Sequence, residues 1–254
     1  MLLTIDIGNT HIKLGVYDGH TLVHHWRVTT ERCKLADEYG VLLYDLFKWE
    51  GMDITAVNGC VISCVVPPLT SQFCTMSRHY LHIEPVVVGA HVQTGLRYQI
   101  DAPHELGSDR IANGLAAYHL YGGPVIAIAL GTATAFDVVT ADGVYIGGAI
   151  APGIAISADA LFRAAARLYQ VELVRPPQVI GKNTVHYIQS GLILGYAGLI
   201  EGMVRRMQQE LDAPCKVVAT GGLAETIANE TEAITVVEPL LTLEGLRIIY
   251  NMNS

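Results

Sequence analysis

The stretch that decides the fold is the first one in the chain, Leu2-Leu3-Thr4-Ile5-Asp6-Ile7-Gly8-Asn9-Thr10-His11-Ile12-Lys13. Apolar side chains at every second position alternate with Thr4 and Asp6, and this period of two is typical of a strand. A Gly-Asn-Thr turn follows, and residues 12–17 form a second alternating run. The pattern predicts a β-hairpin that carries an acid just before its glycine turn.

This hairpin has the chemistry of a phosphate and metal site. Gly8 allows the backbone to approach a ligand closely, the N–H groups after it can donate to phosphate oxygens, and Asp6 can hold a hydrated Mg²⁺. The alternative is a tight turn with a capping Asn9 and a surface Asp6. The five residues from 6 to 10 do not decide between the two interpretations by themselves.

Length, composition and charge narrow the class of protein. The 254 residues allow one large or two ordinary domains, each able to bury a core. With 51% hydrophobic and 16% charged residues we expect a soluble chain whose strands are covered on both faces. The apolar runs at 61–66 and 125–130 are too short for a membrane span, and Asp6 interrupts the first apolar run, so no signal peptide is expected. A net charge of -8 argues against a nucleic-acid or anionic-membrane partner.

The cysteines indicate the compartment. There are five, an odd count at irregular spacing, which predicts a reducing cytoplasm rather than a disulfide framework. Cys60 and Cys64 could be taken for a metal pair, but they lie in an apolar run without a matching histidine pair. We therefore predict that they are core thiols.

The first half of the chain predicts a simple order of elements. A third strand at 21–29 completes a meander, and residues 35–49 have the apolar spacing of a helix. A buried strand at 57–66, closed by Pro67-Pro68, and a helix at 69–81 follow. The order is three strands, helix, strand, helix.

The second half repeats that order. From Val125 an apolar strand runs into Gly131-Thr132, a second strand follows, and a long helix around 187–211 precedes a strand at 216–219. Gly8 lies ten residues before an Asp-Gly turn, and Gly131 lies eleven before its own. The repeat predicts two similar domains that face each other across a cleft, with both glycine hairpins on one polyphosphate. Chance similarity of two glycine turns is the alternative.

Another glycine pair follows the strand at 216–219, in Thr220-Gly221-Gly222. In a nucleotide cleft between two domains, these glycines would admit a flat adenine and its ribose. Without that context, two glycines after a strand usually form only a turn.

The segment Gly107-Ser108-Asp109-Arg110 lies between the halves. Ser108 is predicted to cap a helix, which places Asp109 and Arg110 in its first turn. The structural interpretation is that an acid at a helix start gains about 0.3–1 kcal/mol from the helix dipole without any function. In the functional interpretation, Asp109 accepts a proton from a substrate hydroxyl while Arg110 holds an anionic group of the same substrate. The sequence has no Walker loop and no protein-kinase motif.

Several of these segments together resemble one family. In order and spacing the chain is similar to the type III pantothenate kinases, which belong to the superfamily of sugar kinases, actin and heat-shock chaperones. The similarity covers nearly the whole chain and is specific only when the segments are taken together. They are Asp6-Ile7-Gly8-Asn9-Thr10 with Lys13, Gly107-Ser108-Asp109-Arg110, Gly131-Thr132-Ala133, residues 147–153, Gly181-Lys182-Asn183-Thr184 and Thr220-Gly221-Gly222.

The resemblance implies a fold and an activity. The fold would be α/β, with duplicated actin-like (ribonuclease H-like) domains at 1–110 and 111–254 facing each other across a nucleotide cleft. The activity would be ATP-dependent phosphorylation of pantothenate to 4'-phosphopantothenate, the first step of coenzyme A biosynthesis. The family also implies a cytoplasmic homodimer that uses ATP, Mg²⁺ and a monovalent cation, K⁺ or NH₄⁺.

The resemblance also implies roles for residues. Asp109 would be the catalytic base, Arg110 would pair with the pantothenate carboxylate, and Asp6 would hold Mg²⁺ through water. Gly107, Ser108, Asp109, Arg110 and Thr184 would line the pantothenate pocket, together with position 100. The ATP-binding residues would be Asp6, Ile7, Gly8, Asn9, Thr10, His11, Ile12, Lys13, Gly131, Thr132, Gly221 and Gly222.

Two departures from the family pattern bear on the activity. Ala129 stands where the family usually has the Asp that ligates the monovalent cation, and a methyl group cannot ligate K⁺. Ile100 stands where the family usually has a substrate-contacting Tyr, and it cannot donate a hydrogen bond. These changes predict altered or weakened activity. The alternative function is a nucleotide-binding pseudokinase or a regulatory accessory protein.

Overall fold

The computed structural model describes residues 1–89 and 92–254, and it divides into two compact units. Unit 1 is Met1–Gly95, Asp101–Ala116 and Thr242–Ser254, and unit 2 is Leu96–Ile100 and Ala117–Leu241. These bounds differ from the expected division between residues 110 and 111. The C-terminal segment packs with unit 1, because helix α8 (Leu241–Asn253) places Leu243 against Gly15 and Gly245 against Ala112.

Unit 1 is built on a mixed sheet. Strands β1, β2 and β3 form an antiparallel meander, β4 is parallel to β1, and β5 is parallel to β4. The order across the sheet is β3-β2-β1-β4-β5. The predicted meander is confirmed. The strands are β1 (Leu2–Ile7), β2 (His11–Asp18), β3 (Thr21–Thr29), β4 (Gly59–Cys64) and β5 (Val86–Val87).

The helices of unit 1 differ from the expected ones at their ends. Helix α1 is Ala36–Trp49, close to the predicted 35–49. Helix α2 (Pro67–Met76) begins at the prolines that were expected to close the preceding strand, because the fixed φ and missing N–H of proline suit a helix start. It continues as a π-helical turn, Ser77–Leu81. Single 3₁₀ turns lie at Ile54–Ala56 and Pro103–Glu105, and helix α3 (Ser108–Tyr121) starts in unit 1.

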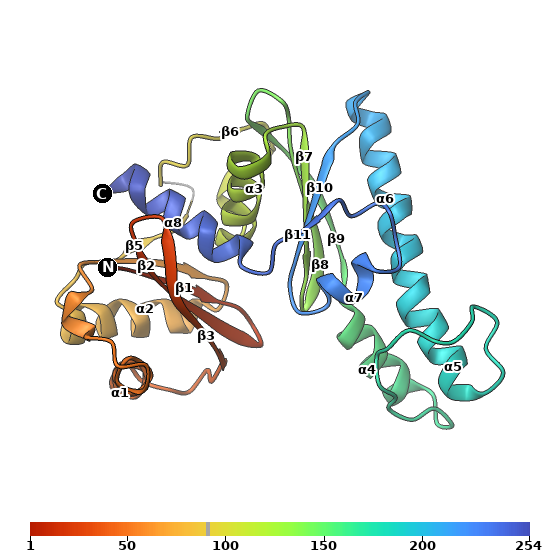
Figure 1. Cartoon of the computed structure of the whole chain (residues 1–254), viewed down its shortest axis with the longest axis horizontal. Coiled ribbons are helices and arrows are strands. Elements are labelled where there is room, and N and C mark those ends of the chain that lie inside the picture. Colours follow the sequence, from red (N-terminus) through yellow and green to blue (C-terminus); the bar gives the residue numbers. More distant parts are fainter. Residues whose placement is uncertain (90–91) are drawn as a thin grey trace. The chain divides into compact units, whose positions relative to one another are not determined.

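One face of this sheet is the apolar core of unit 1. Leu3, Ile5 and Ile7 of β1 are completely buried there, in one cluster with side chains of α1 and α2. Figure 1 shows these two helices beside the sheet. Cys60 is part of this core and Cys64 packs against it, so the prediction of core thiols is confirmed, and burial raises the pKa of the Cys60 thiol to about 12. Because side chains alternate along a strand, Thr4 and Asp6 of β1 point to the opposite face.

Unit 2 repeats the topology of unit 1. Strands β7, β8 and β9 form an antiparallel meander, and β10 and β11 extend the sheet in parallel on the other side of β7. The order is β11-β10-β7-β8-β9-β6, which matches unit 1 strand for strand with β6 added at one edge. The predicted duplication is therefore confirmed. The strands are β6 (Arg97–Tyr98), β7 (Val125–Leu130), β8 (Ala133–Val139), β9 (Val144–Pro152), β10 (Lys216–Thr220) and β11 (Val236–Val237).

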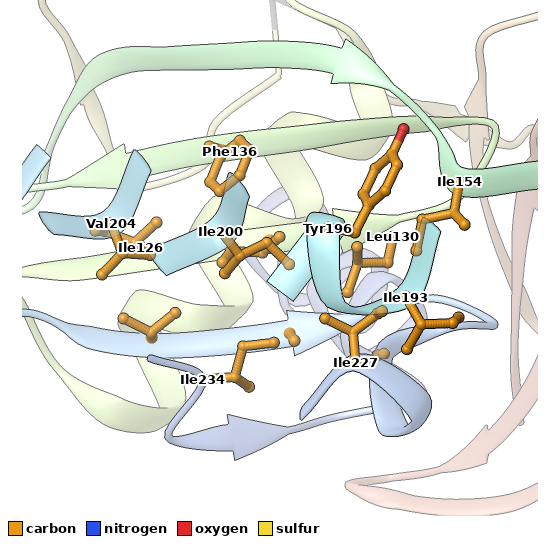
Figure 2. Close-up of a cluster of buried hydrophobic side chains, with 14 of the residues drawn as sticks. Ile126, Leu130, Phe136, Ile154, Ile193, Tyr196, Ile200, Val204, Ile227 and Ile234 are labelled. Atoms are coloured by element: carbon orange, nitrogen blue, oxygen red, sulfur yellow. The ribbon is translucent and has the colours of Figure 1, made fainter. Parts of the chain in front are cut away.

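The core of unit 2 lies between its sheet and its helices. Ile126 and Phe136 of the sheet belong to one apolar cluster with Ile193 and Ile200 of the long helical segment, and all four are completely buried (Figure 2). That segment confirms the predicted long helix and begins at residue 184. The helical elements are α4 (Ile154–Ala164), α5 (Thr184–Gln189), a π-helical turn (Ser190–Leu194), α6 (Gly195–Leu211) and α7 (Ala224–Ala228). Among residues 1–89 and 92–254, every helix is too short or too polar to span a bilayer.

Candidate active site

The candidate site begins where three strands of unit 1 place polar residues side by side. Asp6 of β1 is in register with Lys13 of β2 on one side and with Ser63 of β4 on the other. Because residues in register point to the same face, all three side chains leave the sheet on the face opposite the core. The strand pairing thus gathers an acid, a base and a hydroxyl from three parts of the sequence.

Asp6 is the most enclosed charged group of this cluster, with 6% of its surface exposed. The Lys13 Nζ lies 3.6 Å from Asp6 Oδ2, and the Ser63 hydroxyl donates to Asp6 Oδ1 at 3.1 Å. Burial raises the pKa of Asp6, the charge of Lys13 opposes this change, and the charge of Asp109 adds to it. Asp6 and Asp109 are therefore close enough for the charge of one to influence the other.

The start of α3 joins this cluster through Ser108. The Ser108 and Ser63 hydroxyl oxygens are 3.0 Å apart, and the Ser108 Oγ accepts the N–H of Cys64 at 3.0 Å. Ser108 was expected to cap the helix, but it is the first helical residue, and the carbonyl of Gly107 accepts the N–H of Ile111. Its hydroxyl connects the helix to β4 by a hydrogen bond and does not cap the helix end.

The carboxylate of Asp109 is held at the beginning of the same helix. Its Oδ1 accepts the N–H of Arg110 at 2.9 Å. A Cβ atom on Gly107 would lie 2.7 Å from this oxygen, so the glycine leaves the space that the carboxylate occupies. Gly107 therefore has a steric role beside Asp109, besides any contact with a substrate.

The Gly8 turn, which the sequence predicts to bind phosphate, is held by hydrogen bonds of its own backbone. Its N–H donates to the His11 carbonyl at 3.0 Å, and its carbonyl accepts the Thr30 hydroxyl at 2.7 Å, so the turn is fixed from both sides. Asn9, Thr10 and His11 are exposed. Burial lowers the pKa of His11, and the positive charges of Arg27 and Lys13 add to this change.

Ile7 and Ile12, also assigned to ATP binding, have completely buried side chains. Both lie in the apolar core on the far face of the sheet. A nucleotide at the turn could therefore meet these two residues only through their backbone atoms. The alternation along β1 and β2 is the physical reason, because it sends every second side chain away from the site.

Unit 2 has a similar glycine corner. The N–H of Gly131 donates to the Ala133 carbonyl at 3.0 Å, and the Thr132 carbonyl accepts the N–H of Gly153 at 3.0 Å. Gly221 has a φ of +106°, and a Cβ atom there would lie 2.3 Å from the Leu130 carbonyl oxygen. Gly221 is therefore required by close backbone packing at the end of β10.

The remaining expected site residues also lie in unit 2. Ala129 is in register with Ala135 and Thr220, so no ionisable side chain stands level with it on the two neighbouring strands. Thr184 is the first residue of α5, after Asn183, whose side chain accepts the N–H of His186 at 2.9 Å. Ile100 packs beside Gly147. Unit 1 thus brings Asp6, Lys13, Ser108 and Asp109 together, whereas these other positions belong to unit 2.

Ser63 is the site residue that sequence reasoning missed. Its only signal is that a polar residue interrupts the apolar run at 57–66. Such a serine is usually satisfied by a nearby backbone carbonyl, and the pattern alone does not reveal its partners. Those partners are 45 and 57 residues away along the chain.

Comparisons with known proteins find similar chains over the whole length of this one. A type III pantothenate kinase from Roseiflexus sp. (strain RS-1) is 70% identical over 100% of this chain and 99% of its own length. A type III pantothenate kinase from Moorella thermoacetica is 51% identical over the full length of both chains. Among solved structures, a Campylobacter jejuni protein assigned to the Baf family of transcriptional activators has a TM-score of 0.62 at 22% identity, covering 99% of this chain and 98% of its own.

That last identity shows the fold alone. The same holds for a ROK hexokinase from Thermus thermophilus, which has a TM-score of 0.53 at 14% identity and covers 98% of this chain and 97% of its own. Both support the duplicated actin-like fold that the strand order indicates. The family model for type III pantothenate kinase matches residues 2–206. The chain therefore belongs to the type III pantothenate kinase family.

Proposed function

We propose that this protein transfers the γ-phosphoryl group of ATP to the terminal hydroxyl of pantothenate, which gives 4'-phosphopantothenate for coenzyme A biosynthesis. The observation that carries the proposal is the cluster of Asp6, Lys13 and Asp109 in unit 1, in a chain that belongs to this kinase family. Phosphoryl transfer needs charge neutralisation and positioning more than covalent chemistry, and these residues supply both.

The Gly8 corner and Asp6 fit a phosphate group with its metal ion. Mg²⁺ in proteins is usually held by one or two carboxylates, waters and substrate phosphates, and Asp6 is such a carboxylate. Bound Mg²⁺ would neutralise charge on the phosphate oxygens. Lys13 would contribute its positive charge to the same phosphates, and backbone N–H groups of the turn at the exposed residues Asn9 and Thr10 would donate to them.

Asp109 would act as the general base. A carboxylate at this position accepts the proton of the attacking hydroxyl, a role that contributes about 10²- to 10⁴-fold in rate. Its hydrogen bond from the Arg110 N–H fixes its orientation. Arg110 would pair with the carboxylate of pantothenate through its guanidinium group. Gly107 and Ser108 would line the same pocket in unit 1, and Thr184 and Ile100 would add to it from unit 2.

Unit 2 would contribute the second half of the nucleotide site. We infer that the Gly131-Thr132 corner binds the phosphates and that Gly221 and Gly222 admit the adenosine. The support is the match of the two sheets strand for strand, which gives each unit a glycine corner after the first strand of its meander.

The cation requirement, the assembly and the compartment are inferred in the same way. Ala129 has no ligating atom in its side chain, so we infer a reduced or altered need for K⁺ or NH₄⁺. We infer a homodimer in the cytoplasm. Large apolar side chains exposed on and between α4 and α5 support a partner surface. They are Ile156, Leu161, Val179, Ile180 and Tyr187.

A coupled assay of ADP release tests the proposed function. The purified protein is given ATP, Mg²⁺ and pantothenate, in KCl and in tetramethylammonium chloride. We expect turnover that depends on pantothenate and responds weakly to K⁺. Measurable ATP binding without turnover in either salt would contradict the proposal and would select the pseudokinase, which the family membership does not favour.

A further inference from the structure

Ser63 has an unusual set of partners for a buried serine. It is completely buried, and its Oγ lies 3.1 Å from Asp6 Oδ1 and 3.0 Å from Ser108 Oγ. Another completely buried serine of unit 1, Ser77, shows the ordinary arrangement, because its hydroxyl donates to the backbone carbonyl of Ile83 at 2.9 Å. Ser63 instead connects two side chains of the candidate active site.

The donors and acceptors in this group can be assigned. A hydroxyl has one proton to donate, and an ionised Asp6 can only accept, so the Ser63 proton points to Asp6. The contact between the two serines then requires Ser108 to donate to Ser63. The Ser108 oxygen in turn accepts the N–H of Cys64. The result is a directed chain from the backbone of β4 through Ser108 and Ser63 to the carboxylate of Asp6.

We propose that Ser63 is a positioning residue of this site, whose hydroxyl fixes the Asp6 carboxylate and, through Ser108, the start of α3 that presents Asp109. Asp6 has Lys13 as its other side-chain partner, at 3.6 Å, and the Lys13 side chain is 28% exposed. In the proposed function, on which this inference rests, Lys13 turns to the phosphates. Ser63 then remains as the fixed partner of Asp6 when nucleotide is bound.

The test measures the binding of ADP by calorimetry, with and without Mg²⁺, and kcat/KM for ATP. It compares the wild type with Ser63→Ala, Ser108→Ala, the double variant, and Ser77→Ala as the matched buried control. Mg²⁺ should raise the affinity of the wild type for ADP. In Ser63→Ala this increase should be about tenfold smaller, because a hydrogen bond to a charged group is lost. Its metal-free ADP affinity should stay that of the wild type.

The controls separate positioning from folding. Ser77→Ala removes an equally buried hydroxyl, so it should lower stability comparably while keeping the full Mg²⁺ gain. In the double variant the Mg²⁺-dependent increase in ADP affinity should be the same as in Ser63→Ala, to within about twofold. The reason is that both serines act through one series of hydrogen bonds. If Ser63→Ala does not fold, Ser108→Ala decides, with an expected loss of about threefold.

Several outcomes would overturn the inference. One is a full Mg²⁺ gain in Ser63→Ala, or in Ser108→Ala where that variant decides. Another is a double variant whose loss of the Mg²⁺-dependent increase equals the product of the losses in the two single variants. A wild type whose ADP affinity does not respond to Mg²⁺ would overturn the role of Asp6 in the proposed function and the role of Ser63 with it. A wild type that responds, together with a Ser63→Ala variant that responds equally, would overturn only the role of Ser63.

Discussion

The two units have the same strand order, yet their equivalent positions carry different chemistry. Asp6 lies two residues before Gly8 and is level with Lys13 and Ser63. Ala129 lies two residues before Gly131 and is level with Ala135 and Thr220. The same position therefore exists in both units, but it carries a charged residue only in unit 1.

The difference shows what a buried charge needs. A carboxylate taken out of water is costly unless it has a counter-charge or hydrogen-bond donors. Unit 1 supplies both to Asp6, through Lys13 and Ser63. Unit 2 has Ala129 at the equivalent position, and the residues in register with it, Ala135 and Thr220, carry no charge. The two corners therefore offer different chemistry to a ligand.

The largest expected effect concerns a carboxylate of unit 1. Asp109→Asn should lower kcat about 10²- to 10⁴-fold, because an amide cannot accept the substrate proton. The affinity for ATP should be almost unchanged, which ADP-release assays and nucleotide titrations measure separately. Arg110 keeps its acceptor, since the Asn side-chain oxygen can receive its N–H, so the helix start should persist. Unchanged turnover would show that the proton acceptor lies elsewhere.

A glycine of unit 2 should give the largest effect on stability. Gly221→Ala places a Cβ atom 2.3 Å from the Leu130 carbonyl oxygen at a φ of +106°, and strain of this kind costs about 1–3 kcal/mol or more. Gly131→Ala is the matched control, because its nearest atom would be 3.8 Å away. Urea unfolding of both variants measures the difference. Equal losses of stability would contradict the packing argument for Gly221.

Placing an acid at the equivalent position of unit 2 sharpens the comparison directly. Ala129→Asp introduces a half-buried carboxylate without a lysine beside it, so we expect a loss of about 1–3 kcal/mol in stability. A cation that binds this carboxylate should restore part of the loss. The Tm of the variant should therefore be higher in KCl than in tetramethylammonium chloride, whereas the Tm of the wild type should be nearly equal in the two salts. No salt difference in the variant would mean that position 129 alone does not make a cation site.

The smallest effect is a dependence of stability on pH at Asp6. Burial raises the pKa of Asp6 in the folded state, so its contribution to stability is present below the unfolded pKa and is lost as the pH rises through the folded value. Asp6→Asn should therefore raise Tm relative to the wild type more at pH 7 than at pH 4. A gain of 1 kcal/mol corresponds to about 2–4 °C for a chain of this size.

The exposed Asp142 of unit 2 provides a control of opposite sign. Its hydrogen bond from Thr140 lowers its pKa, so its contribution is present above the unfolded pKa and is lost as the pH falls. Asp142→Asn should lower Tm at pH 7 and have less effect at pH 4. If both variants shift Tm in the same direction, the carboxyl groups do not differ as their surroundings imply.

Much of the fold could be predicted because its signals are local. The period of two in residues 2–17, the glycine turns and the apolar helix faces each depend on neighbouring residues, and they gave the meanders and the long helix of unit 2. Local signals were weaker at element ends, where Pro67 begins a helix instead of closing a strand. The prediction that Ser108 caps the helix was wrong, because its hydroxyl accepts the N–H of Cys64, which is distant in sequence.

The sequence by itself determined the repeated order of elements and the family. It also showed that Asp6 precedes the first glycine turn and Ala129 the second. Only the tertiary structure decided that Ser63 stands level with Asp6, 57 residues away, that Ile7 and Ile12 face the core, and that the C-terminal helix packs with unit 1. The physical reason is that alternation along one strand fixes which residues share a face. Which strands become neighbours, and in what register, depends instead on the packing of the whole unit.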